Sequence, residues 1–73
     1  MTRLTISHAA KAAAVTVETI RFYERRGLIN QPRKPPVGAR EYDAWLIARI
    51  RFIRQAQEFG FSLREIDELL ALR

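Results

Sequence analysis

All three prolines of this 73-residue chain lie in one segment, NQPRKPPVGAREY at 30–42. Proline lacks a backbone N–H and fixes φ, so this segment cannot be helical, and Gly38 permits the chain to reverse. If the residues after the reversal are extended, Arg40 and Tyr42 share one face. We therefore predict a short β-hairpin wing at about 29–42. The alternative is a disordered basic linker, because an isolated two-stranded hairpin is only marginally stable.

Apolar residues recur at helical spacing on both sides of this segment. Two helices are predicted before it, at about 6–13 and 17–26, and two after it, at about 44–59 and 63–73. A residue that commonly caps a helix N-terminus precedes each helix, and the last helix also has a capping box. These residues are Thr5, Thr16, Asp43, and Ser62 with Glu65. The predicted fold class is mainly α, in one domain that spans 1–73.

The third predicted helix carries a wide apolar arc and is expected to be the main core element, with its aromatic side chains buried. Arg49 falls inside that arc, where its side chain either lies over the core or turns toward a phosphate. The residues of the predicted arc are Trp45, Ala48, Phe52, Ile53, Ala56 and Phe59, and the fourth helix has an apolar face of Leu63, Ile66, Leu69 and Leu70.

Positive charge is concentrated in the first part of the chain. Residues 1–54 hold eleven Lys and Arg against four Asp and Glu, whereas residues 55–73 hold two against four. This uneven distribution indicates that the first part meets a polyanion. Nucleic-acid phosphate is favoured over an anionic membrane, because no predicted helix combines a broad bulky apolar face with a lysine-rich polar face.

Length and composition exclude several classes of function. A chain of 73 residues has a core too small to enclose a substrate cavity, so an enzyme is not expected. The chain has no cysteine and a single histidine, His8, so no metal site and no cofactor are expected. No apolar run is long enough for a signal peptide or a membrane span. We expect a cytoplasmic protein.

The helix predicted at 17–26 separates its side chains into two faces. Val17, Ile20 and the following Leu28 are expected to pack against the rest of the chain. A helix in a nucleic-acid groove gains binding energy from exposed arginines and also from an exposed aromatic ring. A glutamate such as Glu18 can accept a hydrogen bond from a cytosine amino group. The alternative is a solvated basic face. The residues of the outward face are Glu18, Thr19, Phe22, Arg25 and Arg26.

Two short helices joined by a tight turn at Ala14 and Val15 form a helix-turn-helix pattern. Further matches extend over almost the whole chain: TIS..A..A.V...TIRFYERRGLI at 5–29, G.R.Y at 38–42 and RFI..A...GFSL.EI.ELL.L at 51–72. In these residues the chain resembles the N-terminal DNA-binding domain of the MerR family of bacterial transcription regulators. VETIRFY, the KP dipeptide and the GFSL.EI.ELL ending are most similar to the mercuric-ion branch.

The resemblance implies a winged helix-turn-helix of four helices that binds an inverted-repeat promoter element as a dimer. The second helix would enter the major groove, the wing would contact backbone phosphate, and Arg64 stands where a second wing approaches the backbone. The outward face of the second helix and the positions implied by the resemblance together give the residues predicted to contact DNA. These are Thr16, Glu18, Thr19, Arg21, Phe22, Tyr23, Arg25, Arg26, Arg40, Tyr42 and Arg64.

The family's dimerisation helix and effector-binding segment are expected to follow residue 73 and to be absent from this chain. The resemblance places the metal-binding cysteines of the mercuric branch in that segment, so inducer sensing is not expected here. A full-length form would be a homodimer that acts with RNA polymerase at the promoter. The 73-residue chain is expected to be a monomer.

Two departures from the family pattern concern local structure. Ala14 stands where the family's turn commonly has glycine, so either this alanine is left-handed, at about 1 kcal/mol, or the turn differs. Leu46 replaces a common acidic residue and leaves the cap to Asp43.

Two other functions are compatible with the sequence. One is a small phage-type excisionase or DNA-bending accessory protein, which has this fold without an effector domain. The other is a protein-interaction module in which the apolar face of the last helix docks a partner.

Overall fold

The computed structural model describes residues 5–72, which form four helices and no strand. The helices are α1 (Ile6–Ala13), α2 (Val17–Arg25), α3 (Ala44–Glu58) and α4 (Leu63–Leu70). The predicted mainly α, four-helix fold is confirmed. The last helix ends earlier than predicted, and Arg73 lies outside the described residues.

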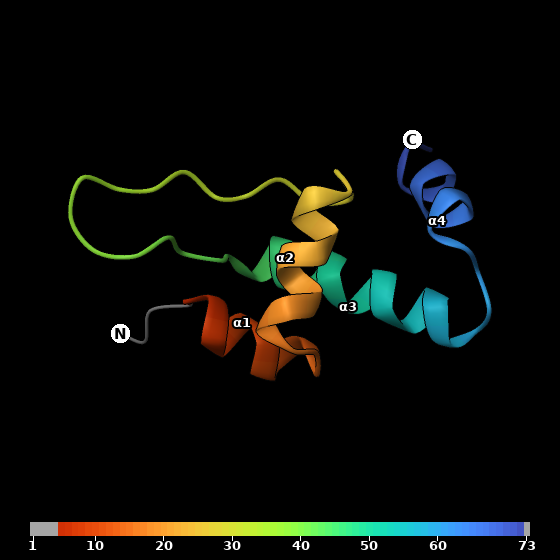
Figure 1. Ribbon diagram of the computed structural model, residues 1–73, viewed down its shortest axis with the longest axis horizontal. Helices are drawn as coiled ribbons and strands as arrows, with labels where there is room; N and C mark the ends of the chain where they lie inside the picture. The colour runs from red at the N-terminus through yellow and green to blue at the C-terminus, as the bar shows by residue number, and fades with distance from the viewer. Residues whose placement is uncertain (1–4, 73) are drawn as a thin grey trace.

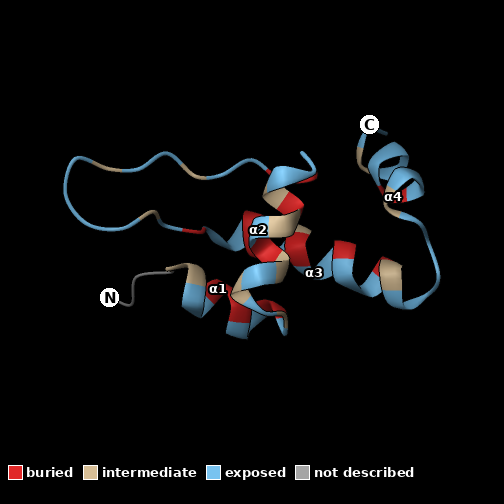
Figure 2. Ribbon diagram, viewed as in Figure 1, coloured by how far each residue is buried: buried red, intermediate tan, exposed pale blue. Residues whose placement is uncertain are grey.

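The long helix α3 connects the two ends of an elongated molecule of 38 × 21 × 21 Å. The helix pair α1 and α2 packs near the start of α3, and α4 packs at its other end (Figure 1). Figure 2 shows buried residues gathered where α1, α2 and the first part of α3 meet. None of the described helices is long and apolar enough to cross a bilayer.

Side chains cap the N-terminus of every helix. The Thr16 hydroxyl accepts from the Thr19 N–H at 3.1 Å, and the Asp43 carboxylate accepts from the Leu46 N–H at 2.8 Å. At α4, Ser62 and Glu65 form the predicted capping box. Each cap satisfies an N–H that lacks a partner within its helix, which matters for helices as short as α1 and α4.

Three of the helices end in the same backbone motif, with one residue in the left-handed region. After α1 this residue is Ala14, with φ 58° and ψ 43°. The Ala14 N–H donates to the Lys11 carbonyl and the Val15 N–H donates to the Ala10 carbonyl, which is the Schellman pattern. After α2 and α3 the corresponding residues are Gly27 and Gly60. The left-handed alternative predicted for the turn is therefore the one observed.

The predicted core face of α3 is largely wrong. The helix buries a seam centred on Ile50 and Ile53, whereas Trp45 is 68% exposed and Phe59 is 86% exposed. The helix is apolar on two sides, and Trp45, Phe52 and Phe59 recur every seven residues on the side opposite Ile50. Only one side can face α1 and α2. The buried residues of α3 are Leu46, Ile47, Ile50, Ile53 and Ala56.

The predicted β-hairpin wing is not present, because no strand occurs in the part of the chain that the structure describes. The segment 30–43 instead forms a long open loop (Figure 1), which we call the long loop. Arg40 Nε donates to the Pro32 carbonyl at 2.8 Å, and this bond joins the two arms of the loop. Three prolines in this segment remove backbone donors that a strand ladder requires.

Two tyrosines tie α2 to its surroundings from inside the core. Tyr23 and Tyr42 are both almost fully buried. The Tyr23 hydroxyl donates to Gln57 Oε1 at 2.6 Å, which links α2 to α3. The Tyr42 hydroxyl donates to Glu24 Oε2 at 2.7 Å, which links the end of the long loop to α2.

We predict that Ala14→Gly raises the free energy of unfolding by roughly 0.5–1 kcal/mol, because glycine adopts the left-handed region without the strain of a Cβ. Ala12→Gly is the matched control. Ala12 is exposed within α1, so glycine there should lower stability by about the same amount. Urea denaturation measures both values, and equal losses in the two variants would contradict the prediction.

We also predict that neither tyrosine ionises near pH 10 while the protein is folded. Burial raises the pKa of Tyr23 above its ordinary value of 10.0. Burial, with the hydrogen bond to Glu24, also raises the pKa of Tyr42. Because both folded-state pKa values exceed the unfolded values, this stabilisation is present below about pH 10 and is lost as the pH rises beyond it.

An alkaline titration followed by tyrosinate absorbance and helical circular dichroism tests this. The two signals should change together, and Tyr42→Phe isolates the Tyr23 signal. A tyrosine that titrates near pH 10 while the helical signal is intact would show that its hydroxyl is not held as described.

Candidate nucleic-acid interface

The outer face of α2 presents charged side chains on a helix whose inner face is fixed. Ile20 and Tyr23 are fully buried, so the rotation of α2 about its axis is set by packing. The opposite side places Glu18, Arg21 and Arg25 in solvent. A helix held in this way presents its exposed side chains in a constant register.

The N-terminus of α2 is polar and accessible. Thr16 is exposed and its hydroxyl lies 3.0 Å from the hydroxyl of the half-buried Thr19. Glu18 lies in the first turn. In a helix-turn-helix protein, the first residues of the second helix are those that reach base edges.

Phe22, predicted to lie on the outward face of this helix, is less exposed than predicted. The Phe22 ring is half-buried and lies against the Tyr23 ring, with the centroids 6.1 Å apart. The Arg26 guanidinium carbon lies 6.0 Å from the centroid of the Phe22 ring. At this distance the ring attracts the cation and orients it on the surface.

Tyr23 and Tyr42, both predicted to contact DNA, lie in the core instead. Their rings have almost no exposed surface, and each hydroxyl already donates to a side chain of the protein. Tyr23 was included from the family resemblance, and the sequence alone did not predict its burial because a tyrosine beside arginines is compatible with either face. We assign both tyrosines to positioning α2 and the long loop rather than to the interface.

The long loop adds cations beside α2. Arg40 is half-buried and Lys34 is exposed, and both line a hollow that Arg21 of α2 also lines. Lys34 was not among the residues predicted to contact DNA. Its position in the basic, proline-rich segment was the available signal. Arg64 is exposed on α4, at the opposite end of the molecule from the long loop (Figure 1).

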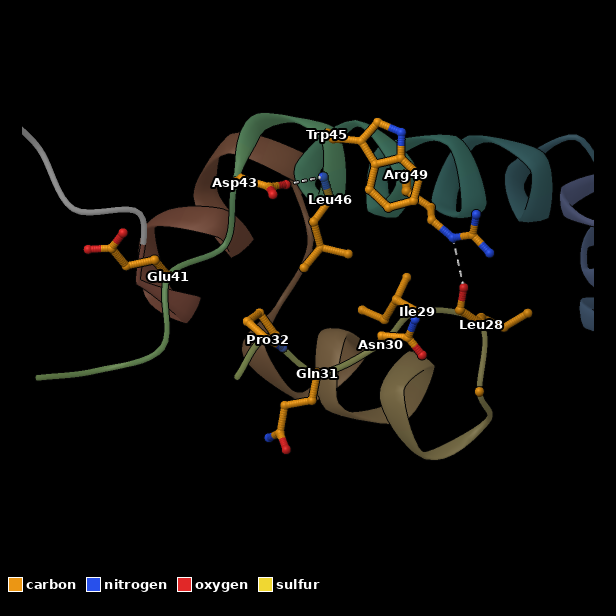
Figure 3. Close-up of a pocket in the computed structure, with 11 residues that line it drawn as sticks. Leu28, Ile29, Asn30, Gln31, Pro32, Glu41, Asp43, Trp45, Leu46 and Arg49 are labelled. Atoms are coloured by element: carbon orange, nitrogen blue, oxygen red, sulfur yellow. Dashed lines mark hydrogen bonds between the residues drawn. The ribbon is translucent and has the colours of Figure 1, made fainter. Parts of the chain in front are cut away.

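Arg49 has a structural role that the sequence left open. Its Nε donates to the Leu28 carbonyl at 2.9 Å, and its guanidinium carbon lies 5.5 Å from the centroid of the Trp45 ring (Figure 3). These contacts border an open hollow of about 310 Å³ between the end of α2 and the start of α3. Arg49 thus holds the chain that leaves α2, and its Nε is not available to a phosphate.

Comparison with known protein families gives one match over nearly the whole chain. Residues 4–72 match the family described as MerR HTH family regulatory protein. The mercuric resistance operon regulatory protein of Serratia marcescens is 55% identical over 69 residues, which cover 94% of this chain and 48% of that protein. The regulator CueR of Yersinia pestis is 42% identical over 94% of this chain and 50% of that protein. The chain spans about half the length of these curated relatives.

Solved structures agree with the sequence matches. A lead(II) complex of a transcription regulator from Ralstonia metallidurans superposes with a TM-score of 0.84 at 37% identity, covering 96% of this chain and 54% of that chain. A MerR family regulator that lacks the sensor domain, bound to promoter DNA, has the same fold, with a TM-score of 0.82 at 22% identity over 93% of this chain and 52% of that chain. The chain therefore belongs to the MerR family of helix-turn-helix regulatory proteins.

Proposed function

We propose that this chain binds promoter DNA as the DNA-binding domain of a MerR-type transcription regulator, with α2 in the major groove and the long loop on the backbone. The observation that carries the proposal is the outer face of α2, where Arg21, Arg25 and Glu18 are exposed on a helix fixed by buried residues. The net charge of +5 favours approach to a polyanion.

Each exposed side chain has a role suited to its chemistry. Glu18, in the first turn of α2, accepts a hydrogen bond from a cytosine amino group. Arg25 and Arg26, at the other end of α2, pair with phosphates on the flanks of the groove. Arg26 is pre-oriented by its contact with Phe22, which lowers the entropy lost when the salt bridge forms.

The regulated genes that best fit the relatives are those of a mercury or other metal resistance operon, since the relatives include mercuric resistance regulators. In the longer regulator, two copies would bind an inverted repeat and act with RNA polymerase. The residues here do not fit a thiolate metal site. The chain has no cysteine, and residues 5–72 hold no group of three metal-binding side chains. We therefore propose that this chain binds DNA, and we propose no role for a metal in that binding.

We predict that Arg25→Ala weakens binding to all DNA sequences about equally and reduces the slope of log K against log salt by about one unit, as expected for one lost phosphate contact. Arg54→Ala is the control, because Arg54 is exposed on α3 and lies 4.0 Å from Glu58. Fluorescence anisotropy at several salt concentrations measures both slopes. Equal changes in the two variants would indicate a diffuse charge effect instead of a contact on α2.

We predict that Glu18→Ala relaxes the preference at one base position, which corresponds to roughly 1–3 kcal/mol of discrimination, and leaves the salt slope nearly unchanged. Asp67→Ala removes the same charge from an exposed position on α4 and should leave the preferred site unaltered. Selection from randomised duplexes measures the preference. An identical preferred site for wild type and Glu18→Ala would remove Glu18 from base reading.

A further inference from the structure

We propose that two copies of this chain associate by exchanging their long loops, with the proline-rich tip of each loop seated in a hollow of the other copy. The hollow lies between the end of α2 and the start of α3, and we call it the Trp45 hollow. The tip is the largely exposed segment 33–37, Arg-Lys-Pro-Pro-Val. This association goes beyond the proposed function. A loop held in another copy is withdrawn from DNA, so the dimer is an alternative to the DNA complex.

The Trp45 hollow has an apolar floor and an ordered aromatic rim. Leu46 of α3 points across it toward Ile29 and Pro32 on the chain that leaves α2 (Figure 3). Its volume of about 310 Å³ is at the lower end of the range of ligand sites. The Trp45 ring is exposed at the rim, with the guanidinium carbon of Arg49 5.5 Å from its centroid. An indole that a neighbouring cation already orients loses little entropy when a partner contacts it.

Acidic side chains border this hollow in a chain that is basic overall. Glu41 and Asp43, from the returning arm of the long loop, both line it. The Asp43 carboxylate is held at the rim because it caps the first turn of α3. Arg49 also lines the hollow, but its Nε is turned to the Leu28 carbonyl. Two carboxylates at one rim, in a chain with a net charge of +5, favour a basic segment as the occupant.

The tip of the long loop has the matching chemistry. Arg33 and Lys34 are exposed and basic, and Val37 is 83% exposed. Two successive prolines follow Lys34, and each proline fixes its own φ and holds the residue before it extended. Extended proline-rich segments lose little entropy on binding and dock against aromatic side chains. The tip therefore combines positive charge, apolar surface and a preset shape.

The backbone of the long loop is also available to a partner. Within residues 5–72, no backbone-to-backbone hydrogen bond involves residues 30–40. Here the loop is joined across its arms by the Arg40 side chain, which donates to the Pro32 carbonyl. An extended segment that exposes its N–H and C=O groups pairs readily with another extended segment.

Two copies can make the contact reciprocally. The long loop projects away from the helices (Figure 1), and the Trp45 hollow lies at its base, where Pro32 and Glu41 line it. Two loops that lie side by side in opposite directions place each tip beside the base of the other loop. The contact is then the same on both copies and closes at a dimer. Each tip is short, so we expect a weak dimer with a dissociation constant of about 0.1–1 mM.

Sedimentation equilibrium from about 10 µM to 2 mM protein, in about 0.15 M salt, measures this association. Lys34→Glu reverses a charge at the tip and should weaken the dimer roughly tenfold. Lys11→Glu is the matched control, since Lys11 is exposed on α1 and does not line the hollow. Both variants lose the same net charge, so relief of general repulsion alone would strengthen association in both. A monomeric wild type, or an equal response in the two variants, would overturn the loop exchange.

A mixing experiment tests whether the contact lies between copies. Glu41→Lys reverses a charge at the rim and should also weaken self-association. In a mixture of Lys34→Glu with Glu41→Lys, each position 34 again meets a position 41 of opposite charge in the other chain. The mixture should therefore dimerise about as well as wild type, and circular dichroism checks that both variants fold. A mixture that associates no better than its components contradicts the exchange, as does a dimer that only Phe59→Ser disrupts.

A peptide of residues 31–38, Gln-Pro-Arg-Lys-Pro-Pro-Val-Gly, is the probe for the hollow itself. Trp45 is the only tryptophan of the chain, so its fluorescence reports on this site. At micromolar protein we expect a saturable change with this peptide, and binding roughly tenfold weaker when the peptide carries Lys34→Glu. A change that does not saturate, or equal binding of the two peptides, would show that the Trp45 hollow does not receive the tip.

Discussion

The core shared by α1, α2 and α3 is the interaction on which the rest of the structure depends. Ile20 and Tyr23 are fully buried on the inner face of α2, and Ile50 and Ile53 are fully buried on α3. The Tyr23 hydroxyl adds a directional bond to Gln57, far along α3. Packing sets the rotation of α2 about its axis, and this hydrogen bond adds a directional constraint to it. The outer face of α2 is therefore presented in one orientation.

A second bond extends this control to the long loop. The hydroxyl of Tyr42, just before α3, donates to Glu24 of α2, so the end of the long loop is bonded to the helix that precedes the loop. Arg21 and Arg40 line one hollow beside this bond. A basic surface beside a rigid helix follows from the same contacts that build the core. The charge pattern and the fold are thus determined together.

Local signals in the sequence predicted the helices and their ends well, because caps and turns depend on neighbouring residues. Thr16, Asp43 and Ser62 cap their helices, and Gly27 ends α2. The sequence did not predict which side of α3 is buried. A helix that is apolar on two sides gives no answer by periodicity, and the arrangement of α1 and α2 selects the side of Ile50 over that of Trp45.

The candidate site was predicted in part, for a related reason. Exposed residues such as Glu18 and Arg25 could be placed from the wheel of α2. The burial of Tyr23 and Tyr42 could not be predicted, because tyrosine suits a core with a polar acceptor as well as a surface. The convergence of Lys34 with Arg21 required the structure, since the two residues lie thirteen positions apart in the sequence.

The most direct test of the account is the position of DNA on the protein, measured by amide NMR shifts on adding a duplex that carries a mercuric resistance operator. The account predicts that the largest shifts fall on α2 and the long loop, and that the side of α3 with Trp45, Phe52 and Phe59 is little affected. Shifts concentrated on that side of α3, with α2 unchanged, would contradict the claim that α2 is the recognition element.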